Sequence, residues 1–401
     1  MDNGTGAMDN GTGAMDSGTG AMDSGTGAMD SGTGAMDSTV AAMTDRTAAI
    51  AERRAAYRAE LADGTGKFHE PRRTTCPWCG SGRLGRRLRT VDFVQEKPGR
   101  FTLDACRDCG HIFQNPRLNQ AGLAFYYRDF YDGLGGESTA KMFQGGGSRK
   151  RFRASTRALL RFATPKRWLD IGTAHGHFCE TAQLLVTEAE FDGLDMGESV
   201  ELAEKEGRIA HAHRGLFTEL AAAELAGNYD AVSMFHYLEH TLDPHAELAA
   251  AHTALRPGGH LLIEVPNPES PYGRLLGRFW VPWFQPQHLQ LMPRRNLCRA
   301  LEAAGFTVVA AEHRDAHIPV DLVCAAWFLV TRVLPKDDAP WLERRPGRAR
   351  RLLRAALALV SLPLILLAYG ADLALAPLVR RTRFSNAYRV IARRDPDGPR
   401  G

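Results

Sequence analysis

The stretch RWLDIGTAHGHF, residues 167–178, decides the fold of this chain of 401 residues. Its first half is an apolar strand that ends in an acid, Asp170, and its second half is a short loop with Gly172 and Gly176 that leads into a helix. A loop that leaves a parallel strand for a helix lies at the carboxyl edge of the sheet, where nucleotides bind. The spacing G-x-A-x-G lacks the full glycine set of a dinucleotide fingerprint, and the acid would repel phosphates. We therefore expect a ligand that carries a cation or an amino group.

Strand and helix patterns alternate on both sides of this loop, from Arg167 to Arg314. The next strand, AEFDGLDM, ends in Asp195, about twenty residues beyond the loop, where an acid can accept both hydroxyls of a ribose. YDAVSMF and LRPGGHLLIEVPNP follow as two further strands, while GFTVVAAEHR and the C-terminal NAYRVIARR predict the sixth and seventh. Such alternation predicts an α/β fold with a mostly parallel sheet flanked by helices.

These segments, in this order, resemble those of the class I S-adenosylmethionine-dependent methyltransferases, in particular the methyltransferase families called type 11 and type 23. More narrowly, they are similar to small-molecule and sugar methyltransferases with an N-terminal zinc module. The resemblance covers about Thr74 to Arg314 and the last strand. It implies a Rossmann-like seven-stranded sheet and S-adenosylmethionine as cofactor.

The resemblance also implies positions for the parts of the cofactor. The residues that would surround the methionine end are Asp170, Gly172, Thr173 and Gly176. Asp195 would bind the ribose, Met196 would pack on the adenine, and Phe235 and His236 would close over the sulfonium. Two departures from the family are visible: Ala174 stands at the usual middle glycine, and Leu216 stands where an adenine-binding acid is often found. Adenine would then depend on backbone groups near Leu216 and Phe217.

Histidines near the end of the fourth strand are candidates for proton removal. A sulfonium donor is already activated, so the protein has to align donor and acceptor and to accept a proton when the acceptor is a hydroxyl. Histidine suits this task because its pKa lies closest to neutral pH. His240 in LEHTLDP and His288 in FQPQHLQLM are the candidates, with Glu239 and His236 behind them. A structural role for any of the 14 histidines remains the alternative.

Two CxxC pairs predict a structural zinc site. They lie in CPWCG and CRDCG and comprise Cys76, Cys79, Cys106 and Cys109. Four thiolates leave no open coordination position on a tetrahedral ion, so the zinc would not be catalytic. The glycine after each pair favours a rubredoxin-like knuckle over a redox motif. Because the basic stretch RLGRRLRT lies inside this module, RNA binding remains an alternative. Cys179, Cys298 and Cys324 fall in apolar helical patterns and are expected in the core.

An apolar insertion separates strands six and seven. It contains LLRAALALVSLPLILLAYGADLALAPLV, residues 352–379, with arginine-rich flanks on both sides. The uncharged run Ala355–Ala371 has 17 residues, which is shorter than the roughly 20 that span a bilayer. Three interpretations stay open: a helical cap or dimer interface, a hairpin that dips into one leaflet and makes peripheral membrane contact, or a transmembrane helix.

The remaining segments complete the domain plan. Residues 1–35 are five copies of MDNGTGA or MDSGTGA, and a decayed sixth copy extends to residue 42; this segment buries too little apolar surface to fold and predicts disorder. We expect a helical linker at 43–73, the zinc ribbon at 74–117, a lid and linker at 118–153, and the cofactor-binding domain at 154–315. The insertion at 316–384, the final strand at 385–394 and a tail at 395–401 follow.

Together with the resemblance, composition and motifs predict an enzyme of the cytoplasm, because the N-terminus shows no secretory signal pattern. We also expect that this enzyme can contact the inner face of the membrane. A net charge of +4 is too mild to favour nucleic acid as the partner. The expected reaction is methyl transfer to an oxygen or carbon of a small molecule or glycoconjugate, such as a sugar, a glycolipid or a secondary metabolite. An RNA methyltransferase and a cofactor-binding protein without catalysis are the alternatives. The oligomeric state is not legible from the sequence.

Overall fold

The structure, a computed structural model, describes residues 33–129 and 146–396. The repeats before Thr33, much of the expected lid and residues 397–401 lie outside the described residues. Contacts divide the chain at Ala48, and the sites discussed below all belong to the unit that begins at Ala49. Helix α1 (Thr33–Leu61) crosses this boundary, and the predicted disorder of residues 1–42 stays a prediction.

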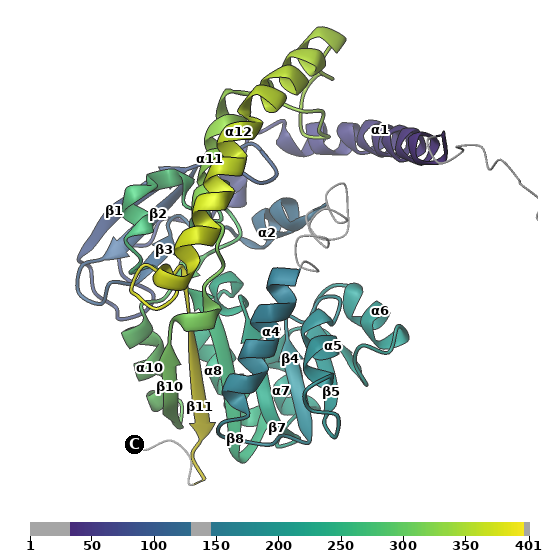
Figure 1. Cartoon of the computed structure of the whole chain (residues 1–401). Helices are drawn as coiled ribbons and strands as arrows, with labels where there is room; N and C mark the ends of the chain where they lie inside the picture. The colour runs from purple at the N-terminus through teal and green to yellow at the C-terminus, as the bar shows by residue number, and fades with distance from the viewer. Residues whose placement is uncertain (1–32, 130–145, 397–401) are drawn as a thin grey trace, which may run out of the picture. The chain divides into compact units, whose positions relative to one another are not determined.

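A sheet of seven strands forms the centre of the part that comprises residues 146–396 (Figure 1). Its order is β10-β11-β8-β7-β4-β5-β6, and neighbours from β8 to β6 are parallel whereas β11 runs antiparallel to both β8 and β10. The strands are β4 (Arg167–Ile171), β5 (Glu190–Asp195), β6 (Ala212–Arg214), β7 (Tyr229–Phe235), β8 (Leu255–Pro266), β10 (Phe306–Glu312) and β11 (Ala387–Arg394). The predicted Rossmann-like α/β sheet is therefore confirmed.

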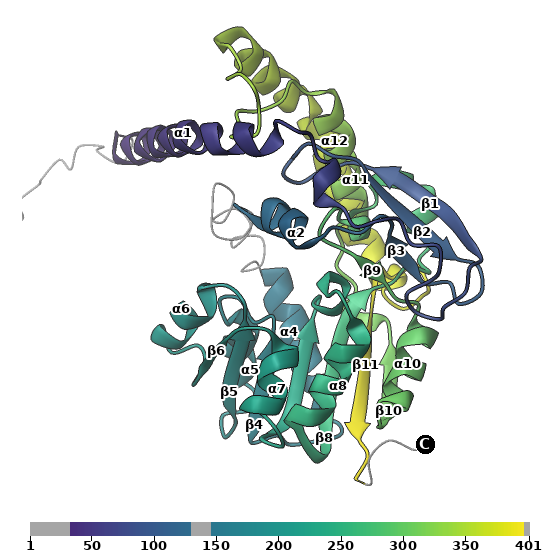
Figure 2. The same ribbon diagram turned by 180° about the vertical axis from the view of Figure 1, so that it is seen from behind.

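Helices cover both faces of this sheet, as Figures 1 and 2 show from opposite sides. One face carries α4 (Gly146–Leu159), α5 (His177–Gln183) and α6 (Ser199–Lys205), and the other carries α7 (Phe217–Ala223), α8 (Pro244–Ala254) and α10 (Arg294–Ala303). Strand residues alternate between the two cores: Trp168 packs with Phe178, while Leu169 and Ile171 belong to the opposite cluster. Period-two alternation with apolar residues on both faces is what a strand buried on both sides requires.

A buried ion network fixes α4 on the sheet. Glu264 of β8 is fully buried, and its Oε1 accepts hydrogen bonds from Arg389 Nε at 2.7 Å and from Ser155 Oγ at 2.6 Å. Its Oε2 accepts a bond from Arg151 Nη1 at 3.2 Å. Burial alone would raise the pKa of Glu264, but the two arginines hold it below its usual range. Charges from three elements thus meet beneath α4.

The cysteine-rich segment forms a second, four-stranded sheet. It consists of β1 (Leu84–Thr90), β2 (Phe101–Cys106), β3 (Ile112–Gln114) and β9 (Gln290–Leu291), in that order. Because β9 comes from the part with the seven-stranded sheet, the module does not complete its own sheet within residues 74–117. An apolar cluster joins Leu103 and Ile112 of the module to Trp280 and Trp283.

The insertion forms two helices, α11 (Asp321–Val333) and α12 (Arg348–Val379), between β10 and β11 as predicted. Asp372 of α12 accepts hydrogen bonds from the first amides of α11, Leu322 N at 3.0 Å and Val323 N at 2.8 Å. Most apolar side chains of α12 are exposed, so the interpretation as a cap packed on its own chain is wrong. Cys298 and Cys324 are half-buried and only Cys179 lies in the core, which corrects the expectation for the first two.

Short elements complete the described fold. These are α2 (Gln120–Tyr127), α9 (Tyr272–Leu275) and the 3-10 turns η1 (Gly66–Phe68), η2 (Leu238–His240), η3 (Gly277–Phe279), η4 (Val281–Trp283) and η5 (Arg314–Ala316). Among them, α2 and η2 contribute side chains to the site described next.

Candidate cofactor and zinc sites

The loop after β4 turns sharply on left-handed backbone positions. Gly172 and Gly176 each have φ +72°, and Ala174 between them has φ +47°. The amide of Gly172 donates to Leu194 O at 2.8 Å, which ties the loop to the end of β5. A Cβ at Gly172 would lie 3.0 Å from the Tyr237 ring, so only glycine fits without displacement. The loop is therefore shaped by close approach of Tyr237 as well as by its turn.

Asp170 lies beneath this loop as a buried acid. Its Oδ1 accepts a hydrogen bond from Ser233 Oγ at 2.5 Å, and Ser233 in turn accepts one from Trp168 Nε1 at 3.0 Å. Burial raises the pKa of Asp170 to about 7, against the hydrogen bonds from Ser233 and Thr173 that lower it. Few cations are near to offset that burial, so a cationic group at the loop would stabilise the ionised form.

Asp195 ends β5 beside the same loop. Its Oδ2 accepts from Ala174 N at 3.0 Å and its Oδ1 from Gly197 N at 2.9 Å, so backbone amides from both sides orient the carboxylate. Two large apolar side chains flank it at the strand ends: Met196 is 67% exposed and Leu216 is 44% exposed. The side chain of Phe217 is buried in the core, which leaves only its backbone for a ligand.

This donor set fits S-adenosylmethionine. A glycine turn under two carboxylates suits the amino group and the ribose hydroxyls, and the exposed apolar flanks suit the faces of an adenine. The residues predicted for this ligand are brought together from the ends of β4, β5 and β6, and the contact of Tyr237 with Gly172 joins them to the end of β7. Which atoms touch the cofactor stays a prediction.

A second polar group follows β7. Phe235 packs on Phe178 with ring centroids 4.4 Å apart, whereas His236 adopts φ +52° and turns its Nδ1 to Glu239 Oε1 at 2.9 Å. Glu239 is fully buried, and neither its Oε2 nor His236 Nε2 has a hydrogen-bond partner among the described residues. Burial would raise the pKa of Glu239, but His236 and neighbouring histidines lower it below its usual range. Two unsatisfied buried atoms in one small group are typical of a site that a ligand completes.

The two predicted base candidates meet here. The rings of His240 and His288 lie 4.7 Å apart and nearly perpendicular. His288 Nδ1 is 2.8 Å from Pro282 O, so this nitrogen carries the proton and Nε2 faces Glu239 Oε1 at 3.9 Å. Burial lowers the pKa of both histidines, that of His288 to about 3. Both rings are therefore neutral near pH 7 and able to accept a proton or to bind a metal.

Tyr127 of α2 is a functional candidate that the sequence did not single out. Its hydroxyl lies 2.8 Å from His240 Nδ1. The aromatic run FYYRDFY around it indicates a lid, but nothing in its spacing indicates which ring reaches His240, 113 positions away. Tyr237 was missed as well: its hydroxyl donates to Glu247 Oε2 at 3.0 Å while its ring closes on Gly172.

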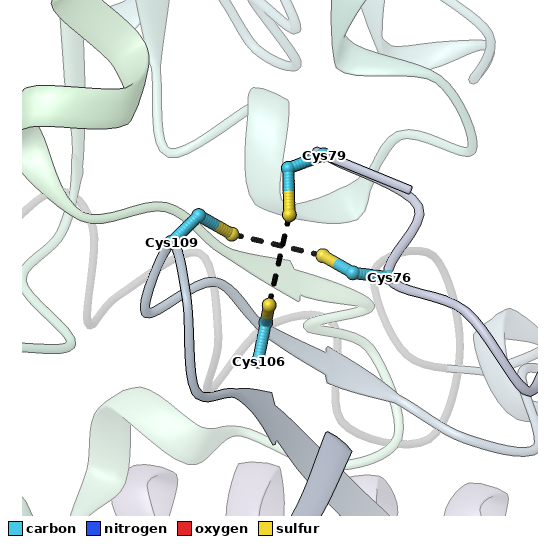
Figure 3. A group of neighbouring side chains, drawn as sticks. All are labelled: Cys76, Cys79, Cys106 and Cys109. Carbon is cyan, nitrogen blue, oxygen red and sulfur yellow. Dashed lines mark hydrogen bonds between the residues drawn. The ribbon is translucent and has the colours of Figure 1, made fainter. Parts of the chain in front are cut away.

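The four predicted zinc ligands converge in the cysteine module, as Figure 3 shows. Cys76 Sγ lies 3.7 Å from Cys109 Sγ, and Cys79 Sγ lies 3.6 Å from Cys106 Sγ. Sulfurs bound at about 2.3 Å around a tetrahedral ion are about 3.8 Å apart, so the cluster fits zinc. Burial raises the pKa of Cys76 to about 11, a cost that a bound cation would offset.

Two other groups have ligand atoms close enough to hold a metal. Glu239, His240 and His288 form one of them, and Glu190, Asp192 and His211 form the other, which is largely exposed. The second is engaged by Arg167, which lies 2.8 Å from Asp192 Oδ2, so a positive charge is already present. A hollow of about 910 Å³ in the described surface is an open depression beside Arg89 and Arg100 and contains none of the predicted site residues.

Comparison with known proteins agrees with this geometry. A family model described as a methyltransferase domain matches residues 147–311. A ubiquinone biosynthesis O-methyltransferase of Pseudomonas aeruginosa (strain LESB58) is 30% identical over 135 residues, 32% of this chain and 54% of that protein. Its counterpart in Pseudomonas paraeruginosa (strain DSM 24068 / PA7) is 30% identical over 166 residues, 39% of this chain and 65% of that protein. This chain therefore spans between half and two thirds of the length of these curated relatives.

Among solved structures, an S-adenosylmethionine-dependent methyltransferase from Archaeoglobus fulgidus aligns with 64% of this chain and 99% of its own, at 21% identity and a TM-score of 0.41.

Proposed function

We propose that this chain, whose residues 147–311 match a methyltransferase domain, is a class I S-adenosylmethionine-dependent methyltransferase that transfers a methyl group from that cofactor to an oxygen or carbon of a small molecule. The observation that carries the proposal is the pairing of Asp170 and Asp195 around the glycine loop at the carboxyl edge of the sheet. A sugar, a glycolipid or a secondary metabolite is the proposed acceptor class. The similarity to ubiquinone biosynthesis O-methyltransferases supports oxygen as the accepting atom.

The cofactor would supply an activated methyl group on a positive sulfur. This chain's residues have three tasks around it. Asp170 would bind the amino group of the cofactor and Asp195 its ribose hydroxyls, while Gly172 lets the cofactor approach the backbone. Met196 and Leu216 would exclude water from the adenine ring. None of these residues needs to take part in bond making.

His240 is the proposed proton acceptor for an acceptor hydroxyl. Its ring is neutral because burial lowers its pKa, and Tyr127 orients it through Nδ1. Glu239 lies close enough to lower the energy of the imidazolium that would form, and His288 packs edge-on against the ring. General-base assistance of this kind contributes about 10² to 10⁴ in rate.

RNA as acceptor gains less support. The basic strand β1 would be its binding surface, but Arg87 in that strand stacks over Trp283 at 5.4 Å and donates to Gly273 O at 3.3 Å. A guanidinium held by an indole of its own chain contributes little to phosphate binding.

Calorimetry with S-adenosylhomocysteine tests the proposal. We expect wild type to bind it, Asp195→Ala to lose at least about tenfold in affinity, and His240→Gln to bind as wild type does. Methyl transfer from labelled S-adenosylmethionine to a panel of phenols, sugars and glycolipids should then fail for His240→Gln although this variant binds the cofactor. If folded, zinc-loaded wild type binds no S-adenosylhomocysteine, the protein does not use this cofactor and the proposed function is wrong.

A further inference from the structure

Helix α12 presents an apolar surface that the described chain leaves uncovered. Its residues 348–379 include a window with mean hydropathy 2.1, none of it buried. The large apolar side chains with more than two thirds of their area exposed are Leu352, Leu359, Val360, Leu367 and Leu378. An apolar patch of this extent on a protein marks an interaction surface.

Only one stripe of α12 is covered. Ala358, Ser361, Ile365 and Ala368 are half-buried and Asp372 is buried, at alternating spacings of three and four residues. This is the seam that faces α11, where Asp372 caps the first amides of that helix. The rest of the circumference is apolar and open. On α11, Trp327 and Val333 extend the same exposed apolar character.

Both ends of α12 are held by the folded body. The connection before the helix is fixed to α1, because Arg54 donates to Leu342 O at 2.9 Å and Trp341 packs on Tyr57 at 5.6 Å. The end of the helix is fixed as well, since Val379 belongs to the cluster with Trp280 and Trp283. Neither end can therefore lie across a membrane from the rest of the chain, which excludes a spanning helix.

Arginines flank the apolar stretch at both ends. Arg348, Arg350 and Arg351 precede it and Arg381 and Arg383 follow it, and none of the five has an ion-pair partner within residues 33–129 and 146–396. The whole helix is about 48 Å long, so the two basic groups stand at opposite ends of one rod. A helix that lies flat at a lipid surface would place both groups at headgroup level while its leucines enter the acyl region.

We propose that α12, together with the exposed face of α11, docks in the plane of an anionic lipid bilayer, as a monotopic anchor on one leaflet. The arginines at both ends of α12 complement anionic headgroups, and both ends of the helix are fixed to the folded body on one side of the bilayer. These two features distinguish docking in one leaflet from a helix that spans the membrane. A second copy of the chain would need acidic groups to match the arginines. The anchor goes beyond methyl transfer and does not depend on it.

Vesicle binding tests the proposal. Full-length protein should co-sediment with phosphatidylcholine vesicles that contain phosphatidylglycerol about tenfold more strongly than with phosphatidylcholine alone, and the difference should shrink at high salt. The combined variant Leu359→Ser, Val360→Ser and Leu367→Ser should lose at least about tenfold in binding. The matched control is Leu184→Ser with Leu202→Ser, which changes one exposed leucine directly after α5 and one on α6, and it should bind as wild type does.

Further readouts decide between occupants. Replacing Arg348, Arg350 and Arg351 by Gln should abolish the preference for anionic vesicles while leaving S-adenosylhomocysteine affinity unchanged. Trp327 should be quenched more by lipids brominated near the headgroup than by lipids brominated near the terminal methyl, and this difference should vanish in Trp327→Phe. Wild type that never binds vesicles but forms a dimer dispersed by the serine variant would overturn the proposal in favour of a second copy. Stronger quenching from the bilayer centre, or a serine variant that unfolds, would overturn it too.

Discussion

At the scale of single residues, the burial of Asp170 sets the protonation behaviour of the site. Asp170 accepts a hydrogen bond from the Ser233 hydroxyl, which itself accepts one from the Trp168 indole, so this contact brings no positive charge to its carboxylate. An acid with a folded pKa of about 7 binds more protons folded than unfolded, where the pKa is about 3.9. Its contribution to stability is therefore largest below about pH 4 and is lost as the pH rises through 7.

The same acid predicts an opposite pH dependence for ligand binding. Because a cationic amino group needs the carboxylate, S-adenosylhomocysteine affinity should rise by up to about tenfold per pH unit below pH 7 and level off above it. Asp170→Asn should bind more weakly and without this slope, measured by calorimetry between pH 5.5 and 8. An unchanged slope in the variant would assign the titration to another group.

Two neighbouring loop positions should respond to opposite substitutions. Ala174 has φ +47°, which costs an L-residue about 1 kcal/mol, so Ala174→Gly should leave stability unchanged or raise it by up to about 1 kcal/mol. Gly172→Ala adds a Cβ at φ +72° that lies 3.0 Å from the Tyr237 ring, and should cost about 1–3 kcal/mol. Urea unfolding of both variants gives the comparison. If both substitutions change the free energy of unfolding in the same direction, the loop relaxes freely around the new side chain.

At the scale of elements, the packing of α4 on the sheet depends on a buried charge cluster. Arg389→Met leaves Glu264 buried beside one arginine only, and should lower the free energy of unfolding by about 3–5 kcal/mol. Arg393→Met on the same strand is the control, because Arg393 is exposed and should change stability by less than about 0.5 kcal/mol.

Acid should reduce the effect of the Arg389 substitution. The lowered pKa of Glu264 contributes stability above its unfolded value, and this is lost as the pH falls through the folded pKa. The gap between wild type and Arg389→Met in urea unfolding should therefore narrow toward acid pH. A gap that stays constant would mean that lost packing, and not charge, explains the variant.

At the scale of the whole molecule, the cysteine module and the half with the seven-stranded sheet share contacts, so we expect them to unfold together. Trp78, between two zinc ligands, packs on His245 of α8 at 4.5 Å, and Asn296 of α10 donates to Cys109 O at 3.0 Å. His111 pairs with Gln290 of β9 at 3.1 Å. A zinc ion held by the four cysteines would therefore stabilise the half with the seven-stranded sheet as well as its own loops.

Loss of zinc should accordingly destabilise the whole unit. We expect about one zinc per chain, lost in Cys76→Ser and Cys109→Ser, with the unfolding temperature lowered by about 10 °C or more in a single transition. Metal analysis and calorimetry measure both. Cys298→Ser should keep its zinc and its transition, since Cys298 lies outside the cluster. Two separate transitions would show that the module melts independently.

The sequence by itself determined those features that depend only on residues close together in the chain. The glycine loop, the acids at the ends of two strands, the succession of strands along the chain and the two CxxC pairs all follow from local pattern and spacing, because strand alternation and metal-ligand turns are set by neighbouring residues. Tertiary structure alone decided that Tyr127 reaches His240, that β9 completes the sheet of the zinc module, that Arg389 neutralises Glu264, and that α12 remains uncovered. Each of these joins residues far apart in the chain or depends on what else packs nearby, and composition cannot report which surfaces the rest of the chain will cover.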